Sequence, residues 1–131
     1  MNEIPLFSSL SIKSITMRNR VVLSPMCQYK AKDGMINDWH LQHYSRFAFS
    51  GLGAAFIEAT GVLPEGRIGH GCTGIWSDDH IEGLSKIAKT FKEYNCVSGI
   101  QLAHAGRKAS FLRPWDGASP ITKEDKIEPA W

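Results

Sequence analysis

Apolar residues form three continuous runs along the chain, and two stretches with helical spacing separate these runs. The runs are RVVLSP (20–25), AAFIEATGV (54–62, whose one charged residue is a glutamate) and CVSGIQLAH (96–104). Short, mostly apolar runs with β-branched residues are typical of strands that are buried on both faces of a parallel sheet. The pattern therefore predicts three buried strands.

Between these runs, apolar residues recur at spacings of three and four, which indicates two amphipathic helices. The first is predicted to begin at Asn37 or Asp38, which are both good N-caps, and to stop at Gly51 and Gly53. The second is predicted to begin after Ser77. The expected buried stripes consist of Leu41, Tyr44, Phe47, Ala48 and Leu52, and of Ile81, Leu84, Ile87, Ala88 and Phe91.

The order strand, helix, strand, helix, strand predicts an α/β fold with a parallel sheet and right-handed crossovers. A short hairpin is predicted within 11–19, and loops are predicted at 31–38, at 63–74 and after His104. Three parallel strands would leave exposed edges, which favours either a very small doubly wound fold or the first part of something larger. Long loops after each strand favour the N-terminal part of a TIM (β/α)8 barrel, with about three of its eight βα units present.

Composition and charge exclude several classes of partner. The net charge of +2 is small and the basic residues are scattered, so no nucleic-acid partner is predicted. No apolar stretch is long enough to span a membrane, and the first residues do not read as a signal peptide. Three widely spaced cysteines argue for a reducing compartment, so the predicted location is cytoplasmic.

Candidate chemistry follows each predicted strand, in SPMCQY (24–29), EATGV (58–62) and QLAHAGR (101–107). These segments are expected to lie on one face and to form a pocket. Cys27 could be a nucleophile, a redox-sensitive thiol or an inert core residue. Tyr29 could donate a hydrogen bond to a substrate oxygen or simply cover the barrel mouth. Gln101 ends a buried strand, where an unpartnered amide would cost roughly 1 to 3 kcal/mol, so a polar partner is expected.

A metal- or thiol-dependent hydrolase that uses His40, His43 or Cys27 is a further alternative. The two histidines are spaced i, i+3 on a predicted helix, but a zinc site needs three or four ligands. No CxxC or HExxH motif is present, and His70 and Cys72 lie in a glycine-rich loop. No metal site is therefore predicted.

Four ordered motifs carry a family resemblance. They are NRVVLSPMCQY (19–29), IEATGVLPEGRI (57–68), GIWSDDHIEGL (74–84) and IQLAHAGRKAS (100–110). Together, over about Leu6 to Pro114, they resemble the start of the Old Yellow Enzyme family, the NADH:flavin oxidoreductases. The resemblance is greatest to the bacterial branch with the xenobiotic reductases, which carries a cysteine where other branches have a threonine.

This resemblance implies an eight-stranded β/α barrel with FMN at the carboxyl ends of its strands. NADPH or NADH would reduce the flavin, which would pass hydride to an activated C=C bond of an enone, enal or nitro compound, as an ene-reductase does. The partners implied are small molecules and, as is frequent in the family, further copies of the chain. Residues 1–131 would be the N-terminal fragment of a single FMN-binding barrel domain.

The resemblance also assigns roles to residues. The flavin contacts implied are Ser24, Pro25, Met26, Cys27, Ala59 and Gln101. Cys27 would modulate the redox potential, Ala59 would leave room for the ring, and Gln101 would hydrogen-bond its pyrimidine side. Tyr29 would hydrogen-bond the substrate oxygen and, with Cys27, is the predicted catalytic residue.

Several parts of the family pattern are expected outside this sequence. The histidine pair that polarises the substrate carbonyl comes after the fourth strand, and the FMN phosphate site follows strands seven and eight. His104 and Arg107 are expected to shape their loop. The alternative to a flavin enzyme is a catalytically inactive barrel remnant that acts only through association.

Overall fold

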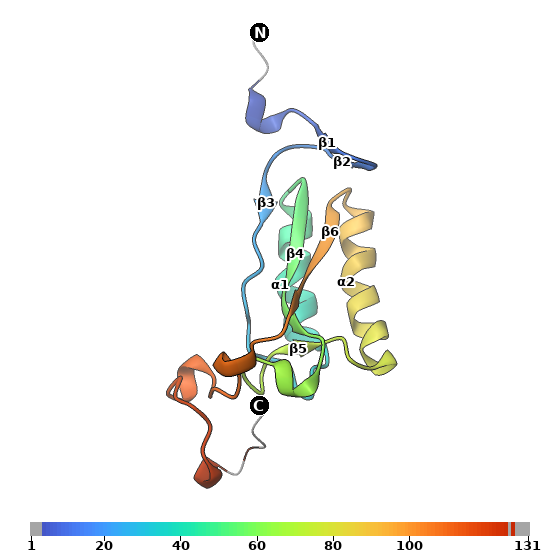
Figure 1. Cartoon of the computed structure of the whole chain (residues 1–131). Helices are drawn as coiled ribbons and strands as arrows, with labels where there is room; N and C mark the ends of the chain where they lie inside the picture. Colours follow the sequence, from blue (N-terminus) through green and yellow to red (C-terminus); the bar gives the residue numbers. More distant parts are fainter. Residues whose placement is uncertain (1–3, 126, 128–131) are drawn as a thin grey trace.

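The computed structural model describes residues 4–125 and residue 127. Three parallel strands form the main part of the sheet, in the order β3 (Val22–Leu23), β4 (Ala54–Gly61) and β6 (Val97–Ala103), with β4 in the middle (Figure 1). Two helices, α1 (Asp38–Phe49) and α2 (Ile81–Glu93), connect them. The predicted alternation of strands and helices is therefore confirmed.

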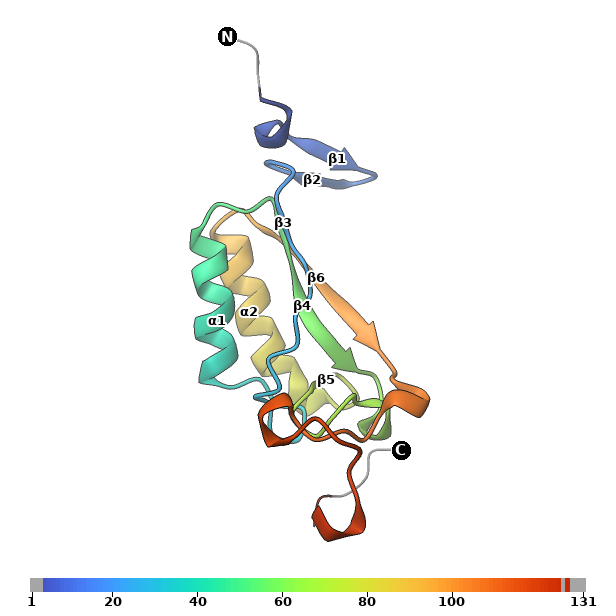
Figure 2. The same ribbon diagram turned by 90° about the vertical axis from the view of Figure 1, so that its left-hand side faces the viewer.

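An antiparallel hairpin precedes the sheet, as predicted. It pairs β1 (Leu10–Ile12) with β2 (Ile15–Met17) and lies at the amino ends of the parallel strands (Figures 1 and 2). Apolar residues of the hairpin, including Met17, share an apolar pocket with Phe56 of the sheet. The hairpin thus lies beside the amino end of the open apolar face, whereas the polar segments gather at the other end of the sheet.

Local chemistry explains where the helices begin. The Asn37 side chain accepts the Trp39 backbone N–H at 3.1 Å, and the His40 side chain returns a bond to the Asn37 backbone, which together cap α1. The Ser77 hydroxyl accepts from Asp79 in the same way, ahead of a 3-10 turn that leads into α2. The predicted cap at Asn37 is therefore confirmed, whereas Ser77 caps the 3-10 turn Asp78–His80 and α2 itself begins only at Ile81.

Both helices pack on the same face of the sheet (Figure 2). The buried core between them and β4 consists of Tyr44, Ala48, Ala55, Ile57, Ile87, Phe91 and Cys96. The prediction that Ile81 belongs to the buried stripe of α2 is wrong, because Ile81 is 56% exposed. His80 is buried instead, where its Nε2 lies 3.2 Å from the Asp33 carbonyl oxygen, so the buried face begins one residue earlier than the apolar spacing suggested.

The opposite face of the sheet is open. Val22 and Phe56, which point to this face, are 42% and 39% exposed. The prediction that the strands are buried on both faces is therefore wrong for this structure, because the described residues provide a helical layer on one side only. An apolar face of this kind is what a closed barrel would turn inward.

The loops carry structure that the sequence pattern did not predict. A two-residue strand, β5 (Thr73–Gly74), pairs in parallel with the end of β4. After β6 the chain forms short 3-10 turns and passes across the carboxyl ends of the strands (Figures 1 and 2). The Phe111 backbone N–H donates to the Ile68 carbonyl at 2.9 Å, which holds this segment against the loop after β4.

No helix in the described ranges combines the length and the apolar character that crossing a membrane requires.

Candidate functional site

Three of the predicted flavin contacts meet at one pocket on the open face. Ser24 and Pro25, which follow β3, share it with Gln101 of β6, and Phe56 lies beside them. Gln101 is exposed, so the prediction that it is buried is wrong. The reason is again the uncovered face, and within the described residues its side-chain amide has no hydrogen-bond partner. Met26, the next residue after Pro25, is 48% exposed.

Cys27 lies deeper and has several hydrogen-bond donors around its sulfur. The Cys72 thiol, the Ala59 backbone N–H and the Tyr29 hydroxyl all point to it. Together they outweigh its partial burial and lower the pKa of the Cys27 thiol from 9.0 to about 6. The structure thus brings together Cys27, Tyr29 and Ala59, which lie far apart in the sequence, and it makes Cys27 a thiolate near neutral pH.

The Tyr29 phenol is a proton donor in this setting. Burial, followed by the charge of Cys27, raises the pKa of Tyr29 to about 12, so the hydroxyl keeps its proton at neutral pH. The Tyr29 backbone has a left-handed φ of 53°, which is uncommon for a residue other than glycine. Its ring meets Trp115 edge to face at 6.5 Å between centroids, so the segment after β6 helps to enclose it.

Glu58 is the buried polar residue that contacts the SPMCQY segment (24–29). The sequence analysis did not identify it as a site residue. The register of β4 against β6 shifts between Ile57 and Ala59, which leaves Glu58 as the extra residue of a β-bulge. Bulges re-aim side chains. The Glu58 carboxylate is fully buried and accepts the Gln28 backbone N–H at 2.7 Å, so it fixes the backbone between Cys27 and Tyr29.

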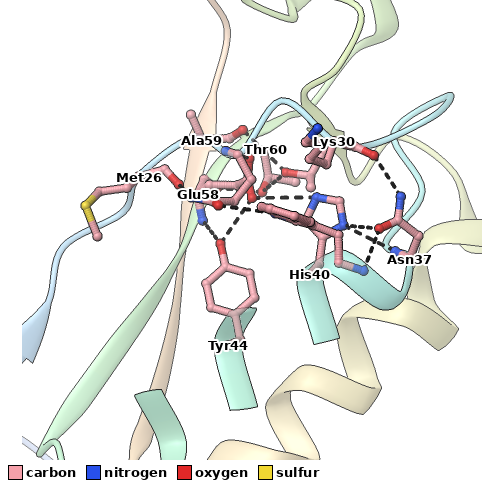
Figure 3. A network of polar contacts seen from close by, with 11 residues as sticks. Met26, Lys30, Asn37, His40, Tyr44, Glu58, Ala59 and Thr60 are labelled. Carbon is pink, nitrogen blue, oxygen red and sulfur yellow. Dashed lines mark hydrogen bonds and ion pairs between the residues drawn. The ribbon is translucent and has the colours of Figure 1, made fainter. Parts of the chain in front are cut away.

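Two side chains of α1 reach up to Glu58 (Figure 3). The Tyr44 hydroxyl accepts the Glu58 backbone N–H at 2.8 Å and donates to Glu58 Oε1 at 3.3 Å. It thereby supplies the partner that the bulge denies to this N–H. His40 Nε2 lies 3.7 Å from the same Oε1, which is longer than a hydrogen bond, while its Nδ1 is 2.9 Å from the Asn37 side-chain oxygen.

Burial sets the charge state of this network. It raises the pKa of Glu58 from 4.5 to about 7, although the Gln28 N–H and the Tyr44 hydroxyl oppose the shift. Burial also lowers the pKa of His40 from 6.5 to about 4. At neutral pH His40 is therefore neutral, and the close approach of His40 to Glu58 is not a salt bridge.

A cation lies at the rim of the site. The Lys30 ammonium is 5.1 Å from the centroid of the Trp39 ring and 4.4 Å from that of the Trp115 ring. Such contacts stabilise a cation on aromatic faces. The Trp39 indole N–H also donates to the Gln28 side-chain oxygen at 3.3 Å, so this rim is tied to the same turn.

The histidines proposed for a metal site take other roles. His40 caps α1 and faces Glu58, and His43 packs edge to face on Tyr44 and Phe47. Among the residues that the structure describes, no group of three or more His, Cys, Asp and Glu side chains is arranged to hold a metal ion. The His104 ring lies close to Gly66, and the expected role of His104 in shaping its loop stays a prediction.

Comparison with known proteins gives a consistent assignment. The sequence profile of the NADH:flavin oxidoreductase / NADH oxidase family matches residues 5–128. The NADPH dehydrogenase of Geobacillus thermodenitrificans (strain NG80-2) is 44% identical over 134 residues, which cover 95% of this chain and 39% of that protein. The NADPH dehydrogenase of Bacillus subtilis (strain 168) is 48% identical over 106 residues, covering 79% and 31%.

Solved structures agree with the sequence relatives. The Old Yellow Enzyme from Pichia sp. AKU4542 superposes with a TM-score of 0.75 at 26% identity, over 81% of this chain and 28% of that one. The chain thus spans about two fifths or less of the length of these relatives. The three parallel strands and their two helices correspond to part of the Old Yellow Enzyme barrel, as the motifs predicted. This chain belongs to the NADH:flavin oxidoreductase / NADH oxidase family.

Proposed function

We propose that this chain supplies the first three βα units of an FMN-binding β/α barrel that acts as an NAD(P)H-dependent ene-reductase. The proposed substrates are small molecules with a C=C bond conjugated to a carbonyl or nitro group. Family membership and relatives named NADPH dehydrogenase support the coarse activity. The ene-reductase step rests on the arrangement of the residues at the carboxyl ends of the strands.

The observation that carries this proposal is a pocket on the open face that combines polar and apolar side chains. Ser24 and Gln101 stand beside Val22 and Phe56 in one pocket, and all four side chains are exposed. A flavin ring is flat and largely apolar, with a pyrimidine side that needs hydrogen-bond donors and acceptors. The free amide of Gln101 meets that need, so the residues present fit FMN.

Ala59 and the SPMC segment would complete the chain's share of the cofactor site. Ala59 is 7% exposed, and its backbone N–H donates to Cys27. A small side chain at this position keeps space for a ring against the strand end. Pro25 and Met26 lie along the same edge, where they would exclude water from one side of the ring.

Cys27 and Tyr29 would take part in the reaction itself, Cys27 beside the cofactor and Tyr29 beside the substrate. When bound, FMN would supply hydride transfer from NAD(P)H to the substrate. The Cys27 thiolate would place negative charge at the edge of the cofactor site and so influence its potential. The Tyr29 hydroxyl, which stays protonated at neutral pH, would donate a hydrogen bond to the substrate oxygen. Glu58 would hold both residues in position through the Gln28 backbone.

A chimera tests the proposal. The segment of the Geobacillus thermodenitrificans enzyme that matches this chain would be replaced by residues 5–125 of this chain. We expect the chimera to bind FMN, to be reduced by NADPH and to be reoxidised by 2-cyclohexenone. A folded chimera that carries FMN but is not reoxidised by any enone, enal or nitroalkene would contradict the ene-reductase step.

Tyr29→Phe in the chimera separates binding from chemistry. It removes the proposed donor to the substrate oxygen but keeps the ring that packs on Trp115. We expect enone reoxidation to slow by about 10- to 100-fold, which corresponds to a lost transition-state hydrogen bond, with flavin content unchanged. Tyr94→Phe, at the exposed residue that follows α2, is the matched control and should leave both quantities unchanged.

The association-only alternative draws on the same open face. The exposed Val22 and Phe56 side chains and the outer edge of β6 would favour pairing with another chain. The two alternatives differ in cofactor content, because a remnant that acts only through association has no need of a flavin. A chimera that associates but stays free of FMN would favour this alternative.

A further inference from the structure

Cys72 has no part in the flavin contacts, yet it is the nearest reactive partner of Cys27. It lies immediately before β5 and is 1% exposed, while Cys27 is only half-buried. The Cys72 S–H donates to the Cys27 sulfur and is the largest influence on the ionisation of Cys27. Two thiols that are 45 positions apart in the sequence therefore face each other at the carboxyl ends of the strands.

Backbone contacts fix the two segments against each other. The Ala31 N–H donates to the Gly71 carbonyl at 3.0 Å, and the Gly74 N–H donates to the Gly34 carbonyl at 2.9 Å. These bonds fall on either side of Cys72. Gly71 also packs so closely on the Tyr29 carbonyl that a side chain there would collide with it. The approach of the two thiols thus belongs to the fold of both loops.

The two sulfurs differ in character. Three donors lower the pKa of Cys27 to about 6, whereas Cys27 and burial raise the pKa of Cys72. At neutral pH, Cys27 therefore carries more thiolate than an ordinary thiol. Thiolates react with peroxides, and a neighbouring thiol can then resolve the product. The pair has a half-buried attacking sulfur and a fully buried resolving one.

We propose that Cys27 and Cys72 form a redox-active pair that closes to an intramolecular disulfide when a hydroperoxide oxidises Cys27. The Cys27 thiolate attacks the terminal peroxide oxygen, so that an S–O bond forms, the O–O bond breaks and an alcohol leaves after taking up a proton. The Cys72 sulfur then attacks the Cys27 sulfenic acid, which forms the S–S bond and releases water. Two thiols and one hydroperoxide give one disulfide, one alcohol and one water.

This inference goes beyond the proposed function, because it needs neither flavin nor nicotinamide. The disulfide would tie the SPMCQY turn covalently to the GHGCTG loop and remove the Cys27 thiolate from the proposed site. A dithiol reductant would reverse it by exchange. In a reducing compartment such a bond would be transient, as redox-sensing disulfides are.

The test uses the purified, fully reduced 131-residue chain and hydrogen peroxide. After oxidation, the sample is denatured, alkylated, and analysed by intact mass and peptide mapping. We expect one alkylated cysteine instead of three, the loss of two hydrogens, and a cross-linked peptide that joins Cys27 to Cys72. Dithiothreitol should restore all three labels.

Serine variants assign the steps. Cys27→Ser should slow thiol loss by about 10-fold or more, because the attacking thiolate is gone. Cys72→Ser should stop at a sulfenic acid on Cys27 that dimedone traps. Cys96→Ser is the matched control and should behave like the wild type, because Cys96 is a buried thiol whose sulfur contacts the Val97 carbonyl rather than either partner.

Three results would overturn the proposal. One is a folded wild-type chain that keeps three alkylatable thiols after oxidation. Another is a cross-link that maps to Cys96. The third is a Cys27–Cys27 bond between two chains, seen as a covalent dimer on a non-reducing gel.

Discussion

The two faces of the sheet have the same kind of side chains but different surroundings. On one face Phe91 of α2 packs on β4 and is fully buried. On the other, Phe56 of β4 is 39% exposed. The first face accounts for the folding of the described chain, since it holds the helices on the strands. The second face has apolar residues that no described residue covers, and the predicted site residues stand at its edge.

The contrast teaches that the stability and the function of this chain lie on opposite sides of the same strands. The helical face holds fully buried side chains such as Phe91 and Ala55, so substitutions there should change stability. Exposure on the open face means that substitutions there should change what the chain binds. Glu58 connects the two, because its backbone bonds to Tyr44 of α1 and its carboxylate holds the turn at the site.

The largest expected effect on stability comes from a substitution on the helical face. Phe91→Ala should lower the free energy of unfolding by about 3 to 5 kcal/mol, as large-to-small changes at fully buried aromatic positions do. Phe56→Ala is the matched substitution on the open face and should cost less than half as much. Urea unfolding at equilibrium measures both values. Equal losses would mean that the open face is covered in solution.

The next effect is the contribution of Glu58 to the pH dependence of the free energy of unfolding. Its pKa is raised from 4.5 to about 7, so between these values the folded chain holds a proton that the unfolded chain has released. The free energy of unfolding therefore falls as pH rises through this window. Glu58→Gln cannot titrate, so its stability relative to the wild type should rise by about 3 kcal/mol from pH 4.5 to pH 7.

Groups that titrate in both chains and lie far from residue 58 cancel in this difference. Glu82→Gln on the exposed side of α2 is the control and should show no such rise. A difference between wild type and Glu58→Gln that stays flat across the window would mean that Glu58 is ionised throughout.

The smallest of the three effects concerns the bulge. Tyr44→Phe removes the hydroxyl that accepts the Glu58 N–H, so a buried donor loses its partner. The expected cost is roughly 1 to 3 kcal/mol, measured by urea unfolding. Tyr94→Phe, which keeps the ring packed edge to face on Phe49, should stay within about 0.5 kcal/mol of the wild type. A Tyr44→Phe chain as stable as this control would show that the bulge N–H finds another partner.

The sequence predicted the order of elements because periodicity and caps are local. The helix cap at Asn37 and the strands around Ala54–Gly61 and Val97–Ala103 agree with the structure. It did not predict which strand faces are covered, because an apolar run has the same pattern whether or not a second layer lies against it. The expected burial of Gln101 failed for this reason.

The site was predicted in part. The motifs placed Cys27, Tyr29 and Ala59 near one another, and the structure brings them together. Glu58 was visible as one charged residue in an apolar strand, which requires buried partners, and this signal could have identified it. The bulge itself and the meeting of Cys27 with Cys72 depend on long-range pairing, which local patterns do not encode. The roles assigned to Ser24, Pro25, Met26, Cys27, Ala59 and Gln101 stay predictions.

The most direct test of the central claim is the visible absorption spectrum of the purified chimera, with intact mass measured on the same sample. If the open face and the strand ends form part of a flavin site, the chimera will carry FMN close to one per chain. Ala59→Leu, which fills the proposed space, will lose the flavin while keeping its far-ultraviolet circular dichroism. A folded but colourless chimera, or full flavin content in Ala59→Leu, would contradict the claim.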